Sequence, residues 1–279
     1  MVIIYRVINK WIETMKMIFG LIVILIIIIR LLGINKVKLL VKYVNNYYAD
    51  NKLLIRIMII ISEVSIFLSF YRIFVSIYKV VNIGYFIVIT LIFHYIFGYM
   101  LVIISRYNEI IGKSLDSNIR EEFLTSYFII SINILLIFIA PRLAIRYIIT
   151  ILVANVISYL INIHILFMFI KNPKVVKLSK KDNSTFFPYL IIGIIIILMI
   201  IVNLYILVIG AYVIDVNTFS NNPSMLDLLY YTIASFVTIG FGDIVPLNNL
   251  GKIIFIIISF TSVLSISIFI GGIYCNRKI

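Results

Sequence analysis

The chain has 279 residues, of which 63% are hydrophobic and 13% are charged, and its mean hydropathy is +1.19. This balance lies far from that of a soluble globular domain and predicts an integral membrane protein. The net charge of +13 comes from lysines and arginines in short loops between apolar runs, a pattern that records membrane orientation more often than nucleic-acid binding. We therefore expect lipid around the protein and no nucleic-acid partner.

The residues that carry catalysis or metal binding are few and scattered. Cys275 is the single cysteine, which excludes an intramolecular disulfide and a thiolate metal cluster. His94 and His164 lie inside apolar runs without the carboxylate or second histidine that a metal site needs, and we interpret both as hydrogen-bonded helix histidines. No nucleophile with a base, phosphate loop or metal-ligand spacing is found. The sequence therefore predicts neither an enzyme nor a bound cofactor.

The first two thirds of the chain contain apolar runs that predict two helical hairpins. Residues 53–78 and 81–105 form the first pair, and residues 123–140 and 143–170 form the second. Each run is close to the length of about 20 residues that crosses a hydrocarbon core. Pro141 lies at the break in the second hairpin, where it suits the first turn of the following helix because its missing N–H costs nothing there.

The last third of the chain carries charges that indicate its orientation. Residues 189–213 and 252–274 predict two further spanning helices. The lysine-rich residues 171–187 precede them, and Arg277 and Lys278 follow them. Positively charged flanks of this kind are typical of the cytoplasmic side, so the C-terminus is expected in the cytoplasm and the segment between the two spans outside.

Between these two spans lies a short apolar stretch followed by TIGFGD. Residues 227–236 would make a helix of roughly 15 Å, half of the hydrocarbon core, so this helix cannot cross the membrane. Irregular backbone at membrane depth is tolerated only where protein or water surrounds it, which favours a re-entrant loop. Gly240 and Gly242 allow positive φ angles, which can aim successive carbonyl oxygens in one direction.

The stretch SFVTIGFGDIVP, set between a short helix and a following apolar helix, resembles the pore domain of potassium channels, and the resemblance covers residues 188–274. It implies an all-α membrane fold with a re-entrant pore helix and a selectivity filter, assembled as a homotetramer. The implied filter consists of Thr238, Ile239, Gly240, Phe241, Gly242 and Asp243. The resemblance implies that the carbonyl oxygens of the first four, with the Thr238 hydroxyl, bind permeant potassium ions, while Asp243 stands behind them.

Several positions beside the implied filter differ from the usual pattern of that family. Tyr230 and Tyr231 lie where the family often has two tryptophans, and we expect their hydroxyls to donate to Asp243. Phe241 replaces the usual tyrosine, as it does in some relatives, which weakens the inference of potassium selectivity. Ala234 takes a position where some relatives have a glutamate.

The inner helix also departs from the pattern. Ser262 takes the position of the family's usual hinge glycine, so any bending there is expected to come from a cluster of serine and threonine. Ile266 and Ile270 are expected to face the cavity as an apolar constriction, because hydrophobic rings can gate by dewetting. The alternative is that these two side chains face lipid or the outer helix.

The four runs before the lysine-rich linker resemble the layout of a voltage-sensor domain. Arg142 and Arg146 are the candidate residual sensor charges, at the outer end of the fourth run. The helix continues as YIITILVANVISYL without another charge until Lys171. Each charge that crosses the whole field supplies about 2.3 kcal/mol per 100 mV, and steep gating needs three or four of them per subunit. We therefore expect weak voltage gating or none.

These inferences combine into one expected organisation. The expected regions are an N-terminal amphipathic and short hydrophobic segment of open topology (1–52), a four-span voltage-sensor-like domain (53–170), a basic cytoplasmic linker (171–187) and a pore domain (188–279). The expected function is passive, potassium-selective conduction by a homotetramer, and the expected location is the cell membrane. The alternatives are a weakly selective cation channel and a non-conducting membrane scaffold or regulatory subunit.

Overall fold

The computed structural model describes residues 38, 41–46, 53–78, 91, 94–95, 98, 102, 119–171 and 186–277. Of the predicted segments, 1–52 is described only at residues 38 and 41–46, 81–105 only at residues 91, 94–95, 98 and 102, and 171–187 only at residues 171 and 186–187. The chain divides into two compact units, one of residues 1–56 with 70–102 and one of residues 57–69 with 103–279. The segment that resembles a pore lies entirely in the second unit.

Two helices of the predicted hairpins lie close to their expected ranges. α3 spans Leu53–Tyr78, the predicted range, and α5 spans Ile119–Ile139. α5 begins before the predicted residue 123 because Glu121 and Glu122 lie in its first turn, where carboxylates favour the positive end of the helix dipole. Periodicity in apolar residues alone misses such a charged first turn.

The predicted run 143–170 is not a single helix. It divides into α6, Pro141–Arg146, and α7, Ile148–Lys171, with a turn at Tyr147. Pro141 lies in the first turn of α6, as predicted, and Ala140 precedes it at the N-cap. The apolar pattern continues through Tyr147, so hydropathy gives no sign of this break.

The last third of the chain forms three helices and one turn of 3-10 helix. α8 spans Phe186–Ile214, η2 spans Val216–Thr218, α9 spans Met225–Phe236 and α10 spans Asn249–Arg277. Pro188 lies in the first turn of α8, where the missing N–H breaks no hydrogen bond. Both long helices extend past their predicted ends by a few residues.

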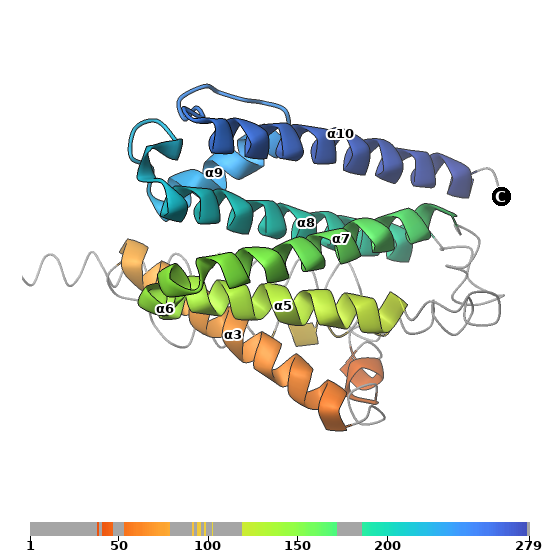
Figure 1. Cartoon of the computed structure of the whole chain (residues 1–279). Coiled ribbons are helices and arrows are strands. Elements are labelled where there is room, and N and C mark those ends of the chain that lie inside the picture. Colours follow the sequence, from red (N-terminus) through yellow and green to blue (C-terminus); the bar gives the residue numbers. More distant parts are fainter. Residues whose placement is uncertain are drawn as a thin grey trace, which may run out of the picture. The chain divides into compact units, whose positions relative to one another are not determined.

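Within the second unit, α5, α7, α8 and α10 pack in this order, and α9 packs between the ends of α8 and α10 (Figure 1). Buried amides and hydroxyls connect neighbouring helices: Asn155 Nδ2 donates to the backbone oxygen of Asn203 at 2.9 Å, and Ser126 Oγ donates to Asn162 Oδ1 at 2.8 Å. Such contacts hold helices together where lipid offers no hydrophobic driving force.

Among the described residues, four helices are long and apolar enough to cross a membrane. They are Glu121–Ile139, Ile148–Met168, Gly193–Ile214 and Asn249–Gly271. α9 is apolar but too short, with 12 residues or about 18 Å. The protein is therefore a multi-pass integral membrane protein whose described regular structure is helical, and α9 enters its helical bundle without crossing.

Candidate functional site

The start of α9 is fixed by a capping box. Ser224 is the N-cap, and its Oγ accepts from the backbone N–H of Asp227 at 3.2 Å. In return, the backbone N–H of Ser224 donates to Asp227 Oδ2 at 2.9 Å, and its hydroxyl donates to the same oxygen at 2.7 Å. The hydrogen bonds from the Ser224 side chain and backbone hold the pKa of Asp227 below its ordinary value.

This lowered pKa predicts how stability depends on pH. Because the pKa of Asp227 is lower in the folded state than its ordinary value of 3.8, the ionised carboxylate stabilises the fold when the pH is above 3.8. This stabilisation is lost as the pH falls below 3.8 and the carboxylate is protonated. We expect the thermal midpoint of the wild type to fall between pH 5 and pH 3 more steeply than that of Asp227→Asn, with Ser224→Ala flattening the curve in the same way. Equal slopes for all three proteins would contradict this role of the capping box.

The end of α9 is tied to the candidate filter that follows it. The N–H of Val237 donates to the carbonyl of Ile233 at 2.9 Å. The N–H groups of Ile239 and Gly240 both donate to the carbonyl of Ala234, at 2.9 and 3.2 Å. Ala234 thus supports the segment through its backbone, at a position where its own side chain is buried and has no polar group.

The candidate filter alternates its backbone conformation. Thr238, Gly240 and Gly242 have φ angles of 61°, 55° and 80°, whereas Ile239 and Phe241 do not have positive φ. In a chain that alternates left- and right-handed residues, successive carbonyl oxygens can lie on one side, whereas those of a β-strand alternate between sides. The predicted positive φ at both glycines is confirmed.

Thr238 was not predicted to take this conformation. A β-branched residue at positive φ is an outlier, and strain of this kind costs about 1–3 kcal/mol and gathers at functional sites. Thr238 is also exposed in the single chain, as are the next five residues up to Asp243. A strained, exposed segment held to the end of a half-buried helix is the central feature of the site.

The two tyrosines of α9 take different positions. Tyr230 stacks on Phe241 with the ring centroids 5.9 Å apart and the planes 13° apart. Desolvation and the neighbouring carboxylate of Asp243 raise the pKa of Tyr230, so its hydroxyl remains a donor toward that carboxylate. Tyr231 instead packs against Phe219 at 5.0 Å, and burial raises its pKa to about 12. The expectation that both hydroxyls donate to Asp243 is wrong for Tyr231, because successive residues of a helix point in different directions, and Tyr230 is the one of the two that lies near that carboxylate.

A polar joint fastens the C-terminal end of α8 to the N-terminal end of α10, and sequence reasoning missed it. Asn248 Nδ2 donates to Asp215 Oδ2 at 2.8 Å and to Thr218 Oγ1 at 3.1 Å. Asn248 Oδ1 also caps α10 by accepting from the N–H of Gly251 at 2.9 Å. An asparagine directly before α10 is a helix-start signal, so the cap could have been predicted from the sequence.

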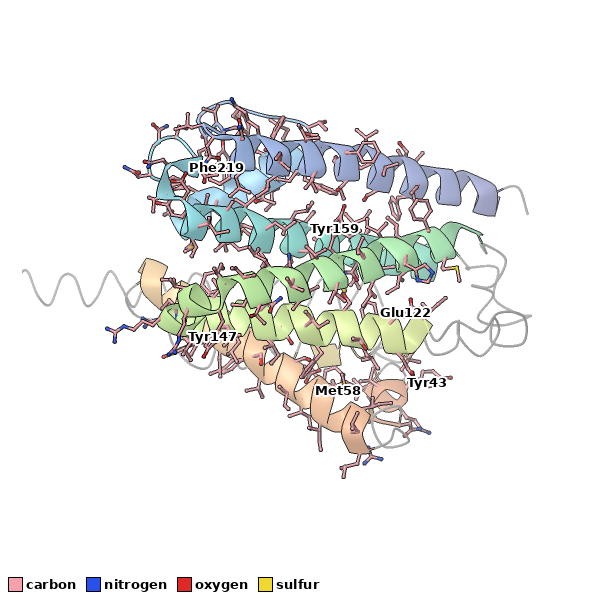
Figure 2. The ribbon with its side chains drawn as sticks, in the orientation of Figure 1. Tyr43, Met58, Glu122, Tyr147, Tyr159 and Phe219 are labelled. Carbon is pink, nitrogen blue, oxygen red and sulfur yellow. The ribbon has the colours of Figure 1, made fainter. Side chains whose placement is uncertain are left out.

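The same joint holds the segment that leaves the candidate filter. Phe219 and Pro246 form an antiparallel bridge, and the N–H of Leu247 donates to the carbonyl of Thr218 at 2.9 Å. Asn221 Nδ2 donates to the backbone oxygen of Asp243 at 2.8 Å. Figure 2 shows Phe219 next to α9, at the opposite end of the helical bundle from Glu122. The filter segment is therefore held at both ends, by α9 before it and by this joint after it.

On α10, the three residues expected to act as hinge or gate have different surroundings. Ser262 is fully buried and its hydroxyl donates to the backbone oxygen of Phe236 at the end of α9. Ile266 and Ile270 are exposed in the single chain, by 38% and 46%. α10 continues as one helix through Ser262.

Outside this segment, the other predicted positions have simpler surroundings. Arg142 and Arg146 are exposed on α6, before the turn at Tyr147, and therefore not on α7 itself. His164 Nδ1 lies 2.9 Å from Glu122 Oε2, so the predicted hydrogen-bonded histidine is confirmed, with a carboxylate supplied by a distant part of the sequence. No group of three metal-ligating His, Cys, Asp or Glu side chains occurs among the described residues.

Comparisons with known proteins agree with this geometry. A family model described as "Ion channel" matches residues 189–274, from α8 to near the end of α10. Searches of curated proteins and of solved structures give no match. The matched range contains the whole candidate filter and the helices on either side of it.

Proposed function

From the ion channel domain that residues 189–274 carry, we propose that this protein conducts potassium passively and selectively across a membrane. The single observation that carries the proposal is the alternation of positive φ at Thr238, Gly240 and Gly242. Backbone carbonyls aimed in one direction can replace the hydration shell of a cation. The carbonyl oxygens of residues 238–241, with the Thr238 hydroxyl, are the proposed potassium ligands.

One chain supplies one side of such a pathway, so the proposed unit is a homotetramer around a shared axis. Two observations support this. Ile239 and Phe241 are exposed by 57% and 66% in the single chain, and α10 exposes a run of large apolar side chains. Large exposed apolar surfaces of this kind mark contacts with protein or lipid. We further propose that α8 and α10 belong to a protein of the cell membrane whose C-terminus is cytoplasmic, as the charges that flank them indicate.

The surroundings of Phe241 bear on selectivity. Phe241 lacks the hydroxyl of the usual tyrosine, but its ring is stacked on Tyr230, whose hydroxyl lies beside Asp243. We propose that Tyr230 provides the brace at the back of the filter that a hydroxyl at position 241 would otherwise provide. The second candidate function, a weakly selective cation pore, follows if this brace is too loose to keep the carbonyl spacing.

Efflux from liposomes tests conduction. We expect vesicles that contain the purified full chain to release potassium down its gradient, and empty vesicles to retain it. A non-conducting scaffold or regulatory subunit predicts no difference between the two. Equal release of sodium and potassium would favour the weakly selective pore over the selective one.

Voltage dependence is expected to be weak because the two arginines of α6 are the proposed remaining sensor charges. Even if both crossed the whole field, Arg142 and Arg146 would supply only about 4.6 kcal/mol per 100 mV in each subunit. Both side chains are exposed before the turn at Tyr147. The guanidinium carbon of Arg146 lies 5.6 Å from the centre of the Tyr147 ring. The double variant Arg142→Gln/Arg146→Gln should therefore keep the shallow conductance–voltage slope of the wild type. A marked loss of steepness in the variant would show that these arginines sense voltage.

A further inference from the structure

The carbonyl groups at the end of α9 have unusual partners. A helix leaves its last four carbonyls without partners inside the helix. Here, three of them, at residues 233–235, accept the N–H groups of Val237, the C-cap, and of residues 238–240 in the candidate filter. The fourth, at Phe236, accepts the hydroxyl of Ser262 from α10. The last carbonyl before the filter is therefore held by a side chain of another helix.

Ser262 differs from its neighbours in how it uses its hydroxyl. Serines and threonines inside helices commonly donate to the carbonyl four residues before them. Ser259 does so toward Phe255 at 3.0 Å, and Thr261 does so toward Ile257 at 2.6 Å. Ser262 instead reaches across to α9, although it is fully buried and within the same helical run. A glycine at this position would leave the Phe236 carbonyl without this donor.

The adjacent residue connects α10 to α7. Thr261 Oγ1 lies 2.6 Å from the hydroxyl of Tyr159, which projects from α7 (Figure 2). Thr261 is buried, and α7 and α10 are in direct contact. Two consecutive residues of α10 thus bind two different helices. Ser262 binds α9, which leads into the candidate filter, and Thr261 binds α7, the last helix before the channel domain.

We propose that Ser262 is a positioning residue for the filter, and that Thr261 and Ser262 together make α10 the link through which α7 acts on the base of the filter. The proposal rests on the function proposed above. Held by Ser262, the Phe236 carbonyl keeps the peptide before Val237 in one orientation, and so keeps Thr238 in its strained conformation. If α7 shifts, Tyr159 displaces Thr261, and the adjacent Ser262 then changes the orientation of the same peptide. This coupling needs no hinge at Ser262.

The test uses the full chain in nanodiscs and hydrogen exchange at the backbone N–H groups of residues 237–240. Ser262→Ala removes the hydroxyl, Ser262→Thr retains it, and Ser259→Ala is the matched control that loses only a hydrogen bond within α10. We expect exchange in Ser262→Ala to be faster by about five- to tenfold, as for the loss of one buried hydrogen bond, with wild-type exchange in the other two variants. Equal exchange in Ser262→Ala and Ser259→Ala would overturn the proposal.

The link to α7 has its own variant pair. Tyr159→Phe removes one hydroxyl, and Tyr147→Phe makes the same change at the exposed turn residue that precedes α7. Tyr159→Phe should raise both the exchange rate at residues 237–240 and the sodium-to-potassium permeability ratio, by less than Ser262→Ala does, and Tyr147→Phe should change neither. An unchanged exchange rate in Tyr159→Phe would show that α7 does not act on the candidate filter through α10. Hydrogen exchange does not depend on ion flux, so the exchange rates test this proposal even if the wild type does not conduct.

Discussion

Replacing Gly240 with alanine is expected to reduce potassium flux through the reconstituted protein by at least about a thousandfold. Gly240 has a φ of 55°, a conformation that costs an L-residue with a Cβ about 1–2 kcal/mol. In the proposed tetramer the cost arises four times, which makes about 4–8 kcal/mol for the ring, and each 1.4 kcal/mol is a factor of ten. Alanine escapes the strain by turning its peptide, which swings a carbonyl away from the pathway.

The control for this variant is Gly271→Ala. A Cβ at either position meets no atom within 4 Å, but Gly271 lacks the positive φ of Gly240. The added methyl group therefore has open space in both variants, and the two positions differ in backbone conformation. Flux and thermal midpoint should be close to wild type in Gly271→Ala. If Gly240→Ala conducts as well as this control, residues 238–241 do not form the narrow part of the pathway.

The second large effect is expected at Gly251, where α10 meets the polar joint. A Cβ there would lie 2.9 Å from Thr218 Cγ2, 3.0 Å from the backbone oxygen of Thr218 and 3.0 Å from Pro246 Cβ. A backbone oxygen and a proline ring cannot turn away as a flexible side chain can. Overpacking of this kind costs about 1–3 kcal/mol, so Gly251→Ala should lower the thermal midpoint and also the flux, because the joint holds the segment after the filter.

Gly210→Ala is the matched comparison for Gly251→Ala. A Cβ at Gly210 would meet the end of the Leu152 side chain, which can change rotamer, and not a backbone atom. Thermal unfolding of both variants in the same detergent should show the larger loss of stability for Gly251→Ala. A larger loss for Gly210→Ala would mean that the contact between α7 and α8 tolerates less change than the polar joint.

Much of the last third of the chain could be predicted from local features of the sequence. Apolar length predicts α8 and α10, the short run before TIGFGD predicts α9, and the glycine spacing predicts the positive φ of Gly240 and Gly242. These are properties of a few consecutive residues. Each follows from helix length or from the absence of a Cβ, without any knowledge of what lies nearby in space.

The features that could not be predicted depend on contacts between distant residues. Ser262 aligns with a hinge position in the sequence, but its hydroxyl binds a carbonyl 26 residues earlier in the chain. Tyr230 and Tyr231 are adjacent in sequence, yet only the packing of α9 decides which of them faces Asp243. The positive φ of Thr238 contradicts the preference of a β-branched residue and is imposed by the hydrogen bonds at the end of α9.

The reversal potential between potassium on one side of the membrane and an equal concentration of sodium on the other tests the central claim most directly. If the carbonyls of residues 238–241 replace the hydration shell of potassium, the potential follows the potassium gradient and departs from zero by more than about 59 mV, the value for a tenfold permeability ratio. Gly240→Ala, where any current remains, should lose this preference. A wild-type reversal potential at zero would mean that the pore passes both cations alike and would contradict a potassium-selective filter in this segment.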